Sequence, residues 1–158
     1  MYMSSELEFR SSAEVLQRWL KRSRESQLSH QLMAERLSSV HRWLGMLTIG
    51  ITAIAGATTL LATLGDVSKV LLALFTLLAA ILSSLQTFLK LEDRTNLHRI
   101  SGAGYGHVRR KLELAMALES SEKEIRLKEA ESELNKLATE SPSVSKRVYD
   151  AALKRNGQ

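Results

Sequence analysis

Charged side chains are almost absent from the middle of the chain. Between Trp43 and Leu89 the only ones are Asp66 and Lys69, which divide this stretch into two apolar runs. As α-helices at 1.5 Å per residue, the runs would be roughly 34 Å and about 30 Å long, which is enough to cross a hydrocarbon core of about 30 Å. The pattern predicts three consecutive segments: a transmembrane helix at 43–65, an external loop at 66–69 and a second transmembrane helix at 70–89.

The segment before the first apolar run is charged and has helical character. No glycine or proline interrupts 13–44, so a cytosolic N-terminal helix over 1–42 is expected to run without a break into the first span. Ser11 and Glu14 form a capping box at its start, in which the hydroxyl accepts a bond from a free backbone N–H and the carboxylate reaches back.

Residues 90–140 are predicted to form further cytosolic helices, one of them starting at a second capping box of Ser121 and Glu124. An apolar seam in this region is expected to pack on the N-terminal helix or on a neighbouring subunit, and it consists of Leu127, Ala130, Leu134 and Leu137. Pro142 ends the seam, and 141–158 is predicted as a terminal short helix. The expected fold is one all-α membrane domain, a two-helix transmembrane hairpin with long cytosolic helical extensions at both ends.

Composition limits the chemistry that the chain can perform. It contains no cysteine, which excludes a disulfide framework, a zinc ribbon and a cysteine nucleophile. The four histidines lack the spacing of metal ligands, and no nucleophile lies next to a base, so we predict neither an enzyme nor a bound metal or other cofactor. The alternative to a membrane protein is a soluble buried hairpin, but the flanking segments are too charged to cover two apolar helices on every side.

Basic residues near the ends of the spans predict the orientation in the membrane. Five of them flank the two spans on one side, and the short loop contains one lysine; the five are Arg36, Arg42, Lys90, Arg94 and Arg99. Basic residues concentrate on the cytoplasmic side of membrane proteins, so both termini are expected in the cytoplasm. The residues expected at the membrane interface are Arg42, Trp43 and Lys90.

Small and hydroxylated residues follow one face of each span. The candidates for pore lining or helix packing are Thr48, Thr52, Thr59 and Thr63 in the first span, and Thr76, Ser83, Gln86 and Thr87 in the second. Small residues allow membrane helices to approach closely, so the faces either hold the hairpin together or line a water path at the axis of an oligomer. Neither span contains a deep ionisable residue, which argues against a pump or a proton-coupled transporter.

Two polar features follow the second span. Gly102, Gly104 and Gly106 either weaken the helix or allow close packing, because glycine costs about 1 kcal/mol in a helix interior. The basic run 109–111 forms either a solvated face paired with acids between Glu119 and Glu133, or a docking site for an acidic partner.

The order of these features resembles the SLATT family, the SMODS and SLOG-associating two-transmembrane effector domains. The likeness covers nearly the whole chain and rests on Trp19 and His30, on 41–45 at the start of the first span, on 84–92 at the end of the second, on His98, Ala103, Tyr105 and 109–113, and on 142–151.

The resemblance implies an effector of a bacterial conflict system, anti-phage and nucleotide-signalled, that oligomerises and permeabilises the inner membrane and so causes growth arrest or cell death. It also implies a partner such as a nucleotide synthase, a SLOG sensor or a reverse transcriptase. Contact with membrane lipid is expected from the two apolar runs, and no direct binding of nucleic acid is expected. The alternative function is a non-conducting membrane anchor or scaffold that recruits a cytosolic partner enzyme.

Overall fold

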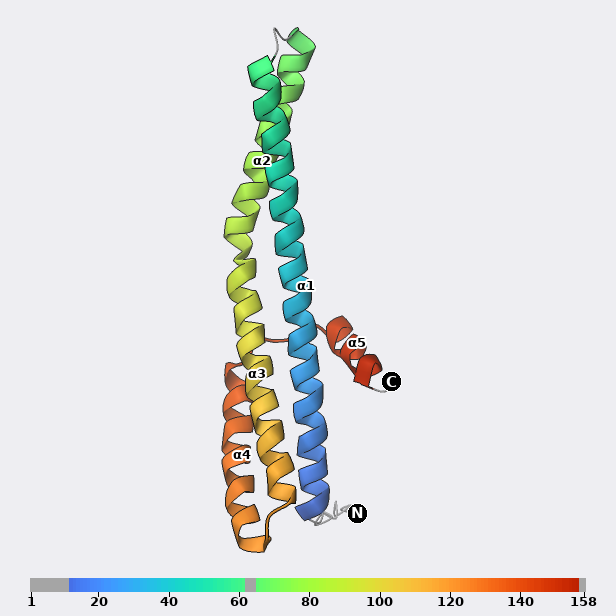
Figure 1. The fold of residues 1–158 in the computed structure, drawn as a ribbon, viewed down its shortest axis with the longest axis vertical. Helices are drawn as coiled ribbons and strands as arrows, with labels where there is room; N and C mark the ends of the chain where they lie inside the picture. The colour runs from blue at the N-terminus through green and yellow to red at the C-terminus, as the bar shows by residue number, and fades with distance from the viewer. Residues whose placement is uncertain (1–11, 62–64, 157–158) are drawn as a thin grey trace, which may run out of the picture. The chain divides into compact units, whose positions relative to one another are not determined.

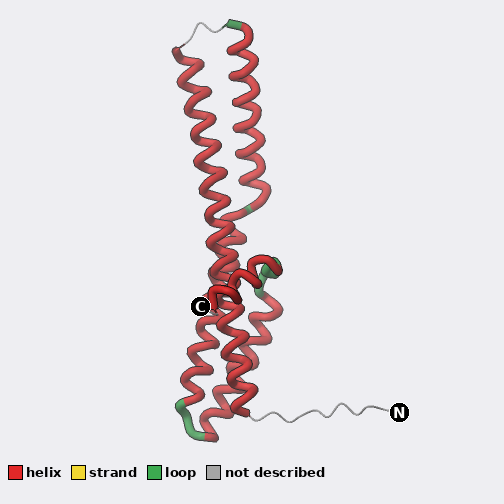
Figure 2. Tube along the Cα trace, turned by 90° about the vertical axis from the view of Figure 1, so that its right-hand side faces the viewer, coloured by secondary structure: helices red, strands yellow, loops and turns green. Residues whose placement is uncertain are grey.

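The computed structural model describes residues 12–61 and 65–156, and within them the chain is helical without any strand (Figures 1 and 2). The helices are α1 (Ser12–Leu61), α2 (Asp66–Leu89), α3 (Leu91–Met116), α4 (Ser120–Glu140) and α5 (Lys146–Asn156). The all-α prediction is confirmed, and α1 runs through 13–44 without a break, as the absence of glycine and proline there predicted. The expected capping residue Ser11 lies outside the described residues.

The helices divide into two compact units. The first, here called the bundle, comprises Met1–Leu32 and Leu97–Gln158, and the second, here called the helix pair, comprises Met33–Asn96. Since the unit boundaries fall inside α1 and α3, each of these helices contributes residues to both units.

The bundle is built around a small apolar core from α1, α3 and α4. Its fully buried members are Leu16, Val108, Leu112 and Ala130, and the half-buried side chains packed against them are Trp19, Leu20, Leu127, Leu134 and Leu137. All four residues of the predicted seam therefore pack on the N-terminal helix and α3 of the same chain. Burying a leucine such as Leu112 stabilises a fold by about 1.5–3 kcal/mol relative to exposing it.

The glycine cluster lies in the middle of α3 and does not interrupt it. A Cβ atom placed on Gly104 would lie 2.7 Å from Cδ2 of Leu137, and one on Gly106 would lie 3.0 Å from Nε2 of Gln27. Of the two predicted roles, close packing is therefore the one observed: α4 approaches α3 where Gly104 has no side chain.

Helix α5 follows a short connection that contains Pro142, and it packs against α1. Val148 and Ala152 are buried, and the hydroxyl of Tyr149 donates a hydrogen bond of 3.0 Å to Oε2 of Glu25. Within the segment predicted as a terminal short helix, 141–158, the structure places α5 at Lys146–Asn156 as a docked part of the bundle.

Two helix starts differ from the prediction. Helix α2 begins at Asp66, so 66–69, predicted as an external loop, is its first turn; a carboxylate is favourable at a helix N-terminus, and Asp66 also accepts a 3.1 Å bond from Lys69. Helix α4 begins at Ser120 with Glu119 in the N-cap position and no side-chain cap bond. Ser121 is therefore inside the helix rather than its cap.

Candidate functional site

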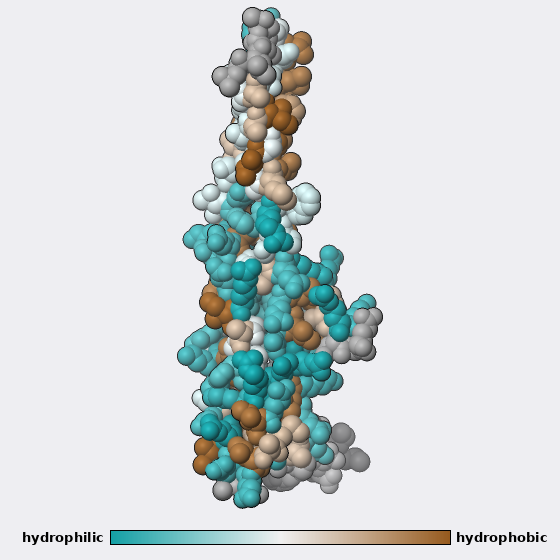
Figure 3. Space-filling view, in the orientation of Figure 1, coloured by the Kyte–Doolittle hydropathy of each residue, from teal (hydrophilic) through white to brown (hydrophobic). Residues whose placement is uncertain are grey.

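The surface of the helix pair is strongly apolar. Large apolar side chains on both helices are more than half exposed, including Trp43 (70%), Ile49 (70%), Ile54 (67%) and Phe88 (83%). In Figure 3 the end of the pair near the α1–α2 turn is mostly brown and pale, whereas its other end carries teal, hydrophilic side chains. Contiguous apolar surface of this kind marks contact with a membrane or with another protein.

One helical stretch among the described residues is long and apolar enough to cross a membrane. It is Asp66–Met116, and its apolar part belongs to α2. Ala79 is the buried residue of α2, so the large apolar side chains of this helix are not buried against the described residues of the chain. The first predicted span, 43–65, stays a prediction; its last residues include 62–64, which lie outside the described residues.

Helices α1 and α2 of the pair run antiparallel beside each other (Figures 1 and 2), and a polar contact fixes their register. Nε2 of Gln86 donates a 3.1 Å hydrogen bond to the hydroxyl oxygen of Thr48. Ala55 lies seven residues, about two turns, after Thr48 on α1, and Ala79 lies seven residues before Gln86 on α2. Both alanines are buried. Two small residues at opposite positions allow the helix backbones to approach closely.

Five threonine hydroxyls of the predicted stripes are bonded to the backbone of their own helix. The bonds run from Thr48 to the carbonyl of Leu44 (2.9 Å), Thr52 to Thr48 (2.8 Å), Thr59 to Ala55 (2.8 Å), Thr76 to Ala73 (2.9 Å) and Thr87 to Ser83 (3.2 Å). Each hydroxyl proton therefore has a partner without water, a condition that suits a helix surrounded by lipid.

The structure brings together only part of the candidate set. Thr48 and Gln86 meet in the α1–α2 seam and are half-buried, whereas five others are exposed on the pair: Thr52, Thr59, Thr76, Ser83 and Thr87. Thr63 lies outside the described residues. The seam of α1 is formed instead by half-buried or buried residues at 3-4 spacing, namely Leu44, Thr48, Ile51, Ala55 and Thr58.

The three predicted interface residues lie at the end of the pair where α2 stops. Arg42 and Trp43 are exposed, and Nη2 of Arg42 donates a 3.3 Å bond to the hydroxyl of Ser39. Lys90 separates α2 from α3 in a left-handed conformation (φ 45°, ψ 45°), which costs a side-chain-bearing residue roughly 1–2 kcal/mol. The break at Lys90 was not predicted from the sequence.

The bundle contains a histidine pair that sequence spacing did not reveal. Nδ1 of His30 on α1 lies 2.9 Å from Nδ1 of His98 on α3, and the ring of Tyr105 stacks on His30 at 5.6 Å between ring centroids. One histidine must donate and the other accept, so the bond requires at least one neutral ring. Burial lowers the pKa of His30 to about 4, helped by the charge of His98, and burial also lowers the pKa of His98.

Two residues of the basic run are paired with acids, and for Lys111 these acids lie in the predicted range between Glu119 and Glu133. Nζ of Lys111 lies 2.6 Å from Glu133 and 4.0 Å from Glu129, both on α4, and Arg109 lies 3.2 Å from Glu113. Within 12–61 and 65–156, no three histidine, aspartate or glutamate residues are grouped so that they could hold a metal ion.

Comparison with known proteins finds no relative: no family model, curated protein or solved structure matches the chain.

Proposed function

We propose that the chain is a two-span membrane effector: the helix pair inserts as a transmembrane hairpin, several copies assemble, and the assembly permeabilises the membrane. The observation that carries this proposal is the exposed apolar surface of the pair, from Trp43 on α1 to Phe88 on α2. Burying apolar surface gains about 25 cal/mol per Å², so side chains this exposed are unfavourable in water and favourable in hydrocarbon.

The hydrogen bonds of the helix pair support a lipid bilayer as its surroundings. Away from the helix ends, the backbone groups of both helices bond within their own helix, and threonine hydroxyls of the pair donate to carbonyl groups one turn away. Between Trp43 and Leu89 the only charged side chains are Asp66 and Lys69 near the turn, and the basic residues just outside this stretch suit a bilayer with both termini in the cytoplasm.

Permeabilisation requires assembly, because two helices cannot enclose a water path. The exposed hydroxylated residues, among them Thr52, Thr76 and Ser83, lie outside the α1–α2 seam and are free to face neighbouring copies. The assignment to a bacterial conflict system, with a nucleotide synthase, a SLOG sensor or a reverse transcriptase as partner, rests on the resemblance to the SLATT family.

Leakage from liposomes tests the proposal. The purified chain, reconstituted at increasing density, is expected to release an entrapped dye with a steep dependence on protein density, since several copies must meet. Replacing Thr52, Thr59, Thr76 and Thr87 together by valine keeps the side-chain volume, removes the hydroxyl groups, and should abolish the release.

The matched control replaces Ile49 and Ile54 by valine, which changes exposed apolar residues on the same surface and keeps every hydroxyl. This control should leak like the wild-type chain. Equal leakage from the threonine variant and its control would exclude a path lined by these hydroxyls.

The second candidate function is a non-conducting anchor that recruits a cytosolic partner. It is favoured by the same hydroxyl bonds, because groups already bonded within their helix need no water path. An anchor should retain the dye at every protein density while remaining in the membrane after carbonate extraction.

A further inference from the structure

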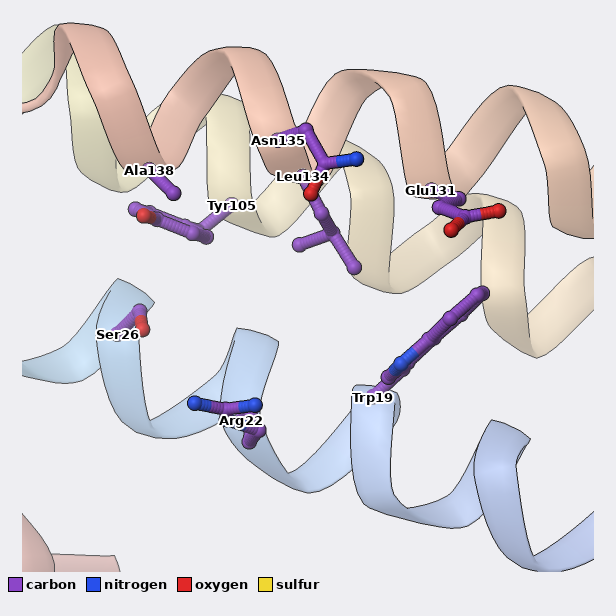
Figure 4. Close-up of a pocket in the computed structure, with 8 residues that line it drawn as sticks. All are labelled: Trp19, Arg22, Ser26, Tyr105, Glu131, Leu134, Asn135 and Ala138. Carbon is purple, nitrogen blue, oxygen red and sulfur yellow. The ribbon is translucent and has the colours of Figure 1, made fainter.

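The bundle contains a cleft between α1 and α4, backed by α3 (Figure 4). Its volume is about 430 Å³, within the range of roughly 300–1,000 Å³ that is usual for small-molecule sites. Trp19, Arg22 and Ser26 line it from successive turns of α1, and α4 lines the opposite side. Ser26 and Ala138 are small, so they leave this space unfilled.

The walls of the cleft combine flat rings with opposite charges. The indole of Trp19 extends from α1 toward α4, and the phenol ring of Tyr105 lies at the other end, with Arg22 between them on the α1 side (Figure 4). Glu131 on α4 lies near the indole. Among the described residues, neither Arg22 nor Glu131 forms an ion pair. Arg22 is near enough to the hydroxyl of Tyr149 to act on it electrostatically, but no carboxylate neutralises its charge by an ion pair.

These groups define the chemistry of a ligand. A guanidinium group binds carboxylate or phosphate in a bidentate manner, and a carboxylate such as that of Glu131 accepts bonds from amino groups. The indole of Trp19 offers a face for stacking a planar ring, and the amide of Asn135 both donates and accepts. A purely apolar ligand would make no use of either charge.

We propose that this cleft binds a small planar aromatic molecule that carries one anionic group, held by Arg22, and one amino group, held by Glu131. Two sources supply this chemistry: an aromatic amino acid, with its carboxylate and ammonium groups, and an aminopurine nucleoside monophosphate, with its phosphate and exocyclic amine. The site belongs to the bundle alone, so it stands whether or not the helix pair permeabilises a membrane.

Trp19 provides the signal for a binding experiment. The experiment uses the full chain in detergent micelles with the substitution Trp43→Phe, so that Trp19 is its only tryptophan. Adenosine monophosphate and L-phenylalanine are titrated separately up to about 10 mM, a range that covers dissociation constants near 1 mM. A saturable change in Trp19 emission with one or both probes is expected, and the responding probe identifies the source of the ligand.

Variants locate the binding site. Arg22→Gln should weaken binding by roughly tenfold or more, because a hydrogen bond to a charged group is lost. Arg24→Gln removes the same charge two residues away on the same helix, outside the cleft, and should change the affinity by less than about twofold. Glu131 is exposed on the opposite wall of the cleft. Glu131→Gln should also weaken binding, because the charged acceptor for the amino group of the ligand is lost.

Circular dichroism confirms that the variants keep their helix content. The proposal is overturned if neither probe produces a saturable change, or if Arg22→Gln and Glu131→Gln both bind as tightly as Arg24→Gln.

Discussion

At the scale of single residues, the bundle depends on a position that has no side chain. Gly104 lets Leu137 of α4 approach α3, where a Cβ atom would lie 2.7 Å from the leucine methyl group. Gly104→Val should lower the free energy of unfolding by about 1–3 kcal/mol, because a branched side chain overpacks this contact. Urea unfolding in detergent, followed by tryptophan fluorescence, measures the change.

The control is Ala103→Val, which introduces the same branched residue at the neighbouring exposed position of α3. It should cost less than about 0.7 kcal/mol, the difference in helix propensity. If both variants lost the same stability, helix propensity rather than the contact between α3 and α4 would explain the effect.

The histidine pair makes the stability of the bundle depend on pH. The folded state keeps His30 neutral down to a pKa of about 4, whereas the unfolded chain takes up the proton below about 6.5. Because the unfolded state binds more protons in this window, stability is complete above it and falls as the pH decreases from about 6.5 toward 4.

Unfolding measured at pH 7 and pH 5 tests this dependence. His30→Gln is neutral at both values and retains a polar group near His98, so its stability should fall less between them than that of the wild-type chain. His107→Gln, at an exposed position of α3, is the control and should keep the wild-type dependence. An unchanged dependence in His30→Gln would assign the effect to other groups.

At the scale of secondary-structure elements, the register of α1 against α2 depends on one interhelical hydrogen bond and two alanines. Gln86→Leu should weaken the association of the helices by about 0.6 kcal/mol, and by no more than about 1.7 kcal/mol, because Thr48 keeps the bond to its own backbone. With Ala55→Cys and Ala79→Cys in the same chain, the rate of disulfide formation in bilayers reports this association.

Disulfide formation should be slower with Gln86→Leu and unaffected by Thr87→Val, which removes an exposed hydroxyl one position away on α2. Failure of the two cysteines to cross-link at all would contradict the register, since a disulfide needs Cα atoms within about 7 Å of each other.

The elements themselves were largely predictable from the sequence. The unbroken α1, the apolar run of α2 and the seam of α4 depend on local periodicity and on the absence of glycine and proline, which the sequence displays directly. The predicted start of α2 was late because Asp66 and Lys69 were interpreted as loop residues. At this position, however, their charges and spacing also suit the first turn of a helix.

At the scale of the whole molecule, the proposed two-span arrangement predicts which positions are exposed outside the cell. The chain has no cysteine, so single cysteines report topology without a background. In intact bacterial cells, Ser68→Cys should react with a membrane-impermeant maleimide, whereas Gln17→Cys and Asn156→Cys should react only after permeabilisation. Basic residues flanking both spans are the physical reason for this orientation.

If one terminal cysteine reacted in intact cells and the other did not, only one helix would cross the membrane. If all three cysteines were labelled to the same extent before and after permeabilisation, the helix pair would not span the bilayer.

The sequence by itself determined the helical class, the position of the apolar middle and the separation of charged from uncharged segments, because each depends on residues close together along the chain. Tertiary structure decided which faces meet. His30 and His98 are 68 residues apart, and their contact, the approach of Leu137 to Gly104 and the cleft beside Arg22 all depend on the rotation and register of neighbouring helices. A helical pattern fixes the residues that share a face, but the packing of side chains between helices selects the partner of that face.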